Sequence, residues 1–185
     1  MKNKFKKLHE GAVLPKKATE GSAAYDLTVT EDVIIKPGRQ VIQLGFALEM
    51  EPGYQALVEP RSGFSSKGME GYEVVRLRTP KYSFGEITGF VGPREVADAQ
   101  VKEYVARESE RFDCDVIVGK IDADYRDGIG VILNNRDKRT FLIKKGTRIA
   151  QLTFLKVENV EWEETDTLSE TERDGGFGST GTKEL

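Results

Sequence analysis

The chain has 185 residues, 38% of them hydrophobic, and a formal net charge of -3 at pH 7. This length and hydrophobic content support one substantial core, and two full domains are not expected. A charge this small argues against direct binding to nucleic acid or to an anionic membrane. The sequence has no apolar stretch that would span a bilayer and no signal-peptide pattern, so a cytoplasmic protein is expected.

Short apolar stretches closed by Pro or Gly dominate the first 68 residues. Residues 1–14 are predicted to form an edge strand that ends before Pro15, and further strands are expected at 33–35, 41–48 and 54–58. Strands at this spacing are typical of a sandwich, barrel or jelly roll rather than of βαβ units. The same pattern returns after residue 114 and is expected to continue to Trp162.

Asp26 and the segment after residue 58 place polar groups beside these strands. Arg61, Ser62 and Gly63 lie in a predicted loop that ends at Gly68. Hydroxyls, backbone N–H groups and a guanidinium suit a polyphosphate, because its oxygens only accept hydrogen bonds. The alternative is an ordinary basic surface loop. A lone Asp within a strand normally faces solvent, which is the simplest interpretation of Asp26.

Residues 69–114 differ from the rest of the chain. A strand is expected at 72–77, and 94–112 are predicted to form an amphipathic helix with its apolar residues on one face. Within that helix Glu103 and Arg107 would form an i,i+4 ion pair. We therefore expect a helix-containing insert in an otherwise all-β chain.

A polar segment at 122–128 separates two apolar strands and contains Asp122, Asp124 and Tyr125. Three interpretations are open on the residues alone. The segment is a solvated turn, because turns favour Asp and Gly for backbone reasons. Alternatively it is a catalytic tip, where a carboxylate deprotonates a water and the aromatic ring packs against a sugar. A calcium loop is the third, but the spacing fails, since Leu133 stands where the EF-hand glutamate would be.

The inventory of reactive side chains is short. Cys114 is the only cysteine and His9, far upstream, is the only histidine. Catalytic triads that need a histidine and Cys/His zinc sites are therefore excluded. We expect Cys114 to be a small buried hydrophobic residue.

The C-terminal part changes from a strand to a polar tail. Residues 148–154 alternate, which predicts Ile149, Gln151 and Thr153 on the face away from the apolar set. Residues 163–174 are acidic and predict a tether. The Gly-rich end formally matches G-x-G-x-x-G, but no βαβ unit surrounds it and it also fails as a P-loop. An ordinary disordered tail and a flexible arm with an aromatic and two hydroxyls both fit the composition.

Five segments together resemble, in order and spacing, the five motifs of the homotrimeric dUTP pyrophosphatases, or dUTPases. They lie at residues 24–27, 60–63, 119–126, 148–152 and 175–181. Each segment is weak evidence alone, whereas five in this order are highly specific. The resemblance implies an all-β, jelly-roll subunit with its core at 1–68 and 115–162, a small helix-containing insert at 69–114 and a flexible C-terminal arm at 163–185.

The resemblance implies hydrolysis of dUTP to dUMP and pyrophosphate in a homotrimer with Mg²⁺. Asp122 is implied to orient the attacking water, and Tyr125 to pack under the deoxyribose. Backbone groups near Gly119 and Gly130 are implied to recognise uracil. Mg²⁺ is implied to be held by substrate phosphates and water, with no protein ligand. In-line attack at phosphorus needs positioning and charge neutralisation rather than a covalent nucleophile.

The remaining implied site residues surround the phosphates or lie in the arm. Asp26 is implied to support four phosphate-binding residues, Arg61, Ser62, Gly63 and Gln151. The arm residues implied to close over the nucleotide are Arg173, Phe177, Gly178, Ser179 and Thr180. Two departures from the family pattern are Asp127, where a glycine is usual, and an arm one residue short beside Arg173.

The insert resembles the extra segment of staphylococcal phage dUTPases, some of which bind a repressor. The resemblance therefore implies a second role in which 69–114 bind a repressor protein, and we expect this insert to be dispensable for hydrolysis. Two alternatives stay open. One is a dCTP deaminase of the same fold, and the other is a regulatory module that uses the nucleotide only as a switch.

Overall fold

A computed structural model describes residues 2–78, 90–94 and 101–172. These residues contain fifteen strands and one short helix, so the predicted all-β class is confirmed. In chain order the elements are β1 (Lys4–Lys7), β2 (Tyr25–Thr28), β3 (Val33–Ile35), β4 (Gly38–Gln43), β5 (Phe46–Glu49), β6 (Tyr54–Glu59), α1 (Ser62–Lys67), β7 (Met69–Arg78), β8 (Phe90–Arg94), β9 (Val101–Ala106), β10 (Glu110–Phe112), β11 (Cys114–Ile117), β12 (Gly119–Ile121), β13 (Gly130–Asn135), β14 (Thr140–Ile143) and β15 (Arg148–Lys156).

The described strands form four sheets. β1 pairs with β5, and the largest sheet has the order β3-β14-β7-β9-β8 with β10 beside β7. The other two sheets have the orders β11-β13-β4 and β12-β6-β15-β2. Neighbours such as β2 and β15, or β4 and β13, are antiparallel and far apart in the sequence. Such long crossovers between antiparallel strands are typical of the predicted jelly roll.

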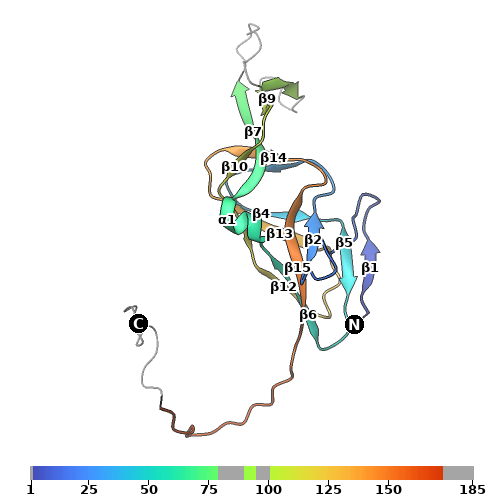
Figure 1. Cartoon of the computed structure of the whole chain (residues 1–185), viewed down its shortest axis with the longest axis vertical. Helices are drawn as coiled ribbons and strands as arrows, with labels where there is room; N and C mark the ends of the chain where they lie inside the picture. The colour runs from blue at the N-terminus through green and yellow to red at the C-terminus, as the bar shows by residue number, and fades with distance from the viewer. Residues whose placement is uncertain (1, 79–89, 95–100, 173–185) are drawn as a thin grey trace.

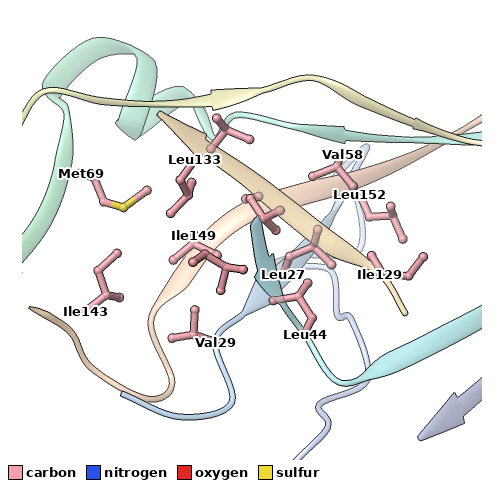
Figure 2. Packing of buried hydrophobic residues seen from close by; sticks show 14 of the residues in the cluster. Leu27, Val29, Leu44, Val58, Met69, Ile129, Leu133, Ile143, Ile149 and Leu152 are labelled. Atoms are coloured by element: carbon pink, nitrogen blue, oxygen red, sulfur yellow. The ribbon is translucent and has the colours of Figure 1, made fainter. Parts of the chain in front are cut away.

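The core lies between the inner faces of these sheets. Along β13, Val131 and Leu133 are fully buried, while Gly130 and Ile132, which alternate with them, face outward. Figure 2 shows Leu133 in one cluster with buried side chains from β6 and β15, including Val58 and Leu152. Each fully buried side chain of this size stabilises the fold by about 1.5–3 kcal/mol. The alternation along each strand therefore decides which residues remain outside to build a site.

The helix predicted at 94–112 is wrong wherever the structure describes those residues. β9 and β10 occupy 101–106 and 110–112, and 95–100 lie outside the described residues. β9 pairs with β7, and the side chain of Glu103 is buried against Arg76. This long-range ion pair replaces the expected local pair with Arg107. β-branched and aromatic residues in β9 suit a strand once β7 provides a partner, so tertiary pairing overrides the helical period.

Both ends of the predicted insert belong to the core. Met69 and Phe112 are buried in the main hydrophobic cluster, and the Phe112 ring stacks on Phe141 with centroids 4.0 Å apart. Cys114 is also buried, which confirms its expected role and raises the pKa of its thiol to about 12. Beyond Val74, β7 pairs only with β9 among the described strands, and Figure 1 shows this part extending outside the body.

Arg139 joins the base of β7 and β10 to the turn between β13 and β14. Its guanidinium lies 2.9 Å from Asp137, 2.7 Å from Glu110 and 3.6 Å from Glu73. The hydrogen bond from Arg139 lowers the pKa of Asp137. Because Arg139 is 40% exposed, each pair contributes at most about 1 kcal/mol, so the cluster aligns these strands more than it stabilises them.

The chain leaves the body after β15. Lys156 is the last residue paired with β6, and no strand of the described chain lies beyond it. The prediction that the strand pattern continues to Trp162 is therefore wrong, and the Trp162 side chain is 92% exposed. Residues 157–172 run away from the body in Figure 1. No helix in the described part of the chain is long and apolar enough to cross a membrane.

Candidate active site

The predicted loop at 59–68 contains a short helix. β6 ends at Glu59, Arg61 has extended backbone angles, and α1 begins at Ser62. The Arg61 carbonyl accepts hydrogen bonds from the N–H groups of Phe64 and Ser65 at 2.8 and 3.1 Å. The N–H groups of Ser62 and Gly63 come before the first intrahelical bond and are therefore available to a ligand. The helix replaces the loop because this carbonyl closes its first turn.

Asp26 links two arginines from distant parts of the chain. Its carboxylate lies 2.9 Å from Arg61 Nε and 3.0 Å from an Arg148 terminal nitrogen. The Asp26 side chain is only 15% exposed, so the solvent-facing interpretation is wrong. Charge-assisted hydrogen bonds of this kind are roughly twice as strong as neutral ones. Arg61 uses Nε for Asp26, and its terminal nitrogens remain free for an anion in the described structure.

Gln151 stands on β15 between Asp26 of β2 and Glu59 of β6 in the strand register. A register shift between Arg148 and Ala150 turns Ile149 into the core, where it is fully buried. The prediction that Ile149 shares a face with Gln151 is therefore wrong. Simple alternation fails because a bulge adds one residue to the strand. Gln151 remains on the outer face.

These residues line one cavity of about 510 Å³, named the arginine pocket. It brings together five predicted site residues from β2, β15 and the start of α1. The loop before β2 also lines the pocket. In the sequence this loop is marked only by a run of small residues. The lining residues are Ala18, Ser22, Ala23, Ala24, Asp26, Arg61, Ser62, Gly63 and Gln151.

The polar turn at 122–128 is held by its own hydrogen bonds. The hydroxyl of Tyr125 donates to the Gly128 carbonyl at 3.2 Å, and Arg126 donates to the Ala123 carbonyl at 2.6 Å. Asp122 follows β12 directly and is exposed, with no side-chain partner in the described chain. No group of three His, Cys, Asp or Glu side chains that could hold a metal occurs among the described residues. The turn thus presents Asp122 as a free carboxylate.

A second cavity of about 260 Å³ lies beside this turn and is named the hairpin cavity. β12 pairs with β6 while β13 pairs with β4, so the two arms of the hairpin separate around it. Three of the predicted site residues, Gly119, Tyr125 and Gly130, line it, and Asp122 adjoins it through Ile121. The full lining is Val41, Gln43, Val58, Ile117, Gly119, Lys120, Ile121, Tyr125, Gly128, Ile129, Gly130 and Ile132.

The contribution of β4 to the hairpin cavity was missed by sequence reasoning. Gln43 and Val41 stand opposite Gly130 and Ile132, a register that only the sheet reveals. A Cβ atom at Gly130 would lie 2.7 Å from Val41 Cγ1, so any larger residue must displace Val41. Glycine is therefore required at 130 by close packing, which the sequence could not indicate.

The dUTPase family model matches residues 10–76 and 97–181. The deoxyuridine 5'-triphosphate nucleotidohydrolase of Nautilia profundicola is 38% identical over 183 residues, which cover 98% of this chain and 99% of that protein. The chain belongs to the dUTPase family. The prediction of an enzyme of this family, made from the five segments, is confirmed.

Two solved dUTPases share the fold. The dUTPase of Staphylococcus bacteriophage 80alpha with dUPNHPP has a TM-score of 0.66 and 23% identity, covering 97% of this chain and 98% of that chain. A dUTPase from phage phi11 of S. aureus, described for its structural Mg(II) ion, has a TM-score of 0.60 and 20% identity, covering 90% and 98%. At these identities the likeness concerns the fold alone.

The dUTPase family model leaves out residues 77–96, which fall within the predicted insert. It includes both the start of β7 and the strands β10 and β11, whose side chains lie in the core. The segment that the family model leaves out is shorter than the predicted insert at 69–114, whose bounds stay a prediction.

The predicted site residues in the described part of the chain fall into two groups. The arginine pocket and the hairpin cavity share no lining residue. Asp122 adjoins the second cavity, whereas the predicted phosphate-binding residues line the first. Arg173, Phe177, Gly178, Ser179 and Thr180 lie outside the described residues, as does the rest of 173–185.

Proposed function

We propose that this chain hydrolyses dUTP to dUMP and pyrophosphate. The observation that carries the proposal is the arginine pocket, in which Asp26 orients Arg61 beside the N–H groups of Ser62 and Gly63 and the amide of Gln151. Every group except Asp26 supplies a hydrogen-bond donor, and Asp26 is occupied by two arginines. Such a set suits the phosphate oxygens of a nucleotide, which only accept hydrogen bonds.

The reaction needs one base and no covalent intermediate. Asp122 accepts a proton from a water whose oxygen forms a bond to the α-phosphorus, and the bond from that phosphorus to the bridging oxygen breaks. Pyrophosphate leaves with the bonding electron pair and dUMP remains. The free carboxylate of Asp122, beside a cavity that would hold the base and sugar against Tyr125, supports this role.

A second copy of the chain completes the site in this proposal. Because the two cavities share no residue, the Asp122 carboxylate of one chain would act on phosphates held in the arginine pocket of another. The outer face of β11-β13-β4 also carries an apolar row, Ile117, Ile132 and Val41, in direct register. Val41 is 57% exposed in the single chain. Because these residues also line the hairpin cavity, a second copy that contacts the row would border the site, which supports the homotrimer implied by the family, with three equivalent sites.

Mg²⁺ fits this arrangement as an ion that arrives with the substrate. The arginine pocket supplies cations and neutral donors, and its one carboxylate is paired with arginines, so substrate phosphates and water would hold the metal. When bound, the ion neutralises charge on the triphosphate. We further propose that the arm at 163–185 closes over the nucleotide, and that truncation after Glu170 leaves a folded trimer with severely reduced turnover.

One assay separates the candidate activities. The purified chain is given dUTP or dCTP with Mg²⁺, and pyrophosphate and ammonia are both measured, with EDTA as the metal-free control. Pyrophosphate from dUTP that depends on Mg²⁺ is the expected result. Ammonia from dCTP would indicate the deaminase instead, and nucleotide binding without either product would indicate a regulatory module.

A protein partner of the insert is the second candidate function. The observation that favours it is that β7 extends outside the body, and that the family model leaves out the end of β7 and the residues after it, 77–96 in all. We infer a repressor-type partner that contacts this extension. Binding of a purified repressor to the full chain and to a variant with a shortened extension tests the idea, and unchanged affinity for the variant would refute it.

A further inference from the structure

Gln43 lines the hairpin cavity but belongs to none of the five family segments. It lies at the end of β4, directly opposite Gly130 of β13. Its side chain is exposed, and the amide has no hydrogen-bond partner in the described part of the chain. A neutral group with one donor and one acceptor is thus free at the edge of a largely apolar cavity.

The Gln43 amide lies against the hairpin at a point where two glycines leave room for it. A Cβ at Gly128 would lie 3.1 Å from Gln43 Oε1, and a Cβ at Gly130 would lie 3.4 Å from Gln43 Nε2. The amide therefore occupies the space left by two glycines. This contact also gives Gly128 a purpose one position after Asp127, where the family pattern has its glycine.

The chemistry of the cavity selects what this amide binds. Val41 and Ile132 form an apolar surface and Tyr125 adds an aromatic ring, so a flat molecule with apolar faces fits between them. Apart from Gln43 and backbone groups, the polar side chains in the lining are Lys120 and the Tyr125 hydroxyl, which is bonded to Gly128. A neutral amide suits the neutral polar edge of a pyrimidine better than it suits a phosphate.

We propose that Gln43 hydrogen-bonds the polar edge of the nucleotide base and contributes to base binding, an inference that rests on the proposed function. Uracil presents an acceptor, a donor and an acceptor along that edge. The carboxamide pairs with an adjacent donor and acceptor of this edge, and backbone groups of the hairpin take the rest. A base left without these partners would carry unpaired polar groups into the cavity.

The test compares Gln43→Leu, Gln43→Asn and the wild type, with Gln55→Leu on β6 as the matched control. Steady-state kinetics with dUTP are combined with inhibition by dUMP, which contains the base, and by pyrophosphate, which does not. For Gln43→Leu we expect KM for dUTP and Ki for dUMP to rise by roughly 3- to 10-fold, the loss of one hydrogen bond. The values for kcat and for pyrophosphate inhibition should stay within about twofold.

Each outcome decides a different point. Gln43→Asn, which keeps the amide but shortens its reach, should fall between the wild type and Gln43→Leu. An unchanged Ki for dUMP in Gln43→Leu overturns the inference while leaving the hydrolase intact. Equal losses toward dUMP and pyrophosphate together with a lower Tm would assign Gln43 a structural role and also overturn it. Absence of dUTP hydrolysis in the wild type would instead remove the proposed function.

Discussion

The arginine pocket and the hairpin cavity differ in what positions their polar groups. In the arginine pocket, ion pairs between side chains set the geometry, since Asp26 holds both Arg61 and Arg148 within 3.0 Å. In the hairpin cavity the main chain does so, through two diverging strands and the glycines at 128 and 130. The arginine pocket therefore depends on placed charges, and the hairpin cavity depends on the shape of the backbone.

This difference predicts different effects of mutations in the two regions. Removing a charge partner from the arginine pocket leaves its backbone intact but frees the guanidinium groups to adopt other positions. Adding a methyl group at Gly130 in the hairpin cavity forces Val41 to move, because the new Cβ would lie 2.7 Å from Val41 Cγ1. Mutations in the two regions should therefore separate into effects on phosphate binding and effects on base and sugar binding.

Asp122→Asn should have the largest effect. The amide keeps the shape of the side chain but cannot accept the proton of the attacking water, so kcat should fall by about 10²- to 10⁴-fold with nucleotide affinity retained. Pyrophosphate release and binding of a non-hydrolysable dUTP analogue measure the two quantities. Asp124→Asn, on the same turn, is the control and should remain near wild type. Retention of a tenth of the wild-type turnover by Asp122→Asn, roughly a 1.4 kcal/mol effect, would contradict the role.

Asp26→Asn tests the arginine pocket. Loss of the carboxylate frees Arg61 and Arg148, and we expect Ki for pyrophosphate to rise by about 10-fold, with a loss of about 1–3 kcal/mol in the free energy of unfolding. Inhibition assays and urea unfolding provide the measurements. Glu49→Gln removes the exposed ion pair with Lys4 and serves as the control. Pyrophosphate inhibition equal to that of the wild type would show that Asp26 does not align these arginines.

Gly130→Ala tests the hairpin cavity. Its Cβ would meet Val41 Cγ1 at 2.7 Å, so we expect a cost of about 1–3 kcal/mol in stability and an increase of about fivefold in KM for dUTP. Thermal unfolding and steady-state kinetics measure both effects. Adding Val41→Ala should restore much of each, because it removes the atom in conflict. If the double variant behaves like the sum of two independent losses, close packing between these residues is not the cause.

Shortening the insert should have the smallest effect on hydrolysis. Arg78 of β7 stands opposite Val101 of β9, so an Asn-Gly turn in place of 79–100 can join the two strands. Among the described residues, none of those that line the two cavities comes from β7, β8 or β9, and kcat/KM should stay within about twofold of wild type. The comparison variant, with 69–114 replaced by a Gly-Ser loop, should not fold because Met69 and Phe112 are core residues. An active, folded comparison variant would contradict the assignment of this base to the core.

Local patterns carried much of the fold and the candidate site. Short apolar stretches with turn residues predicted the all-β class, and order and spacing of five segments predicted the family. The helix at 94–112 failed because its residues also suit a strand, and only the presence of β7 decides between the two. The predicted outward orientation of Ile149 is wrong because a bulge shifts the register of β15 by one residue.

The sequence by itself determined which chemical groups are present and in what order, including a carboxylate at Asp122 and donors at 61–63. Tertiary structure alone decided their neighbours: Asp26 with Arg148, and Gln43 with Gly130, are separated by many residues and meet only through strand pairing. Local propensity acts over a few residues, whereas sheet register depends on burying one face of every strand together. The division of the site into two cavities follows from that register.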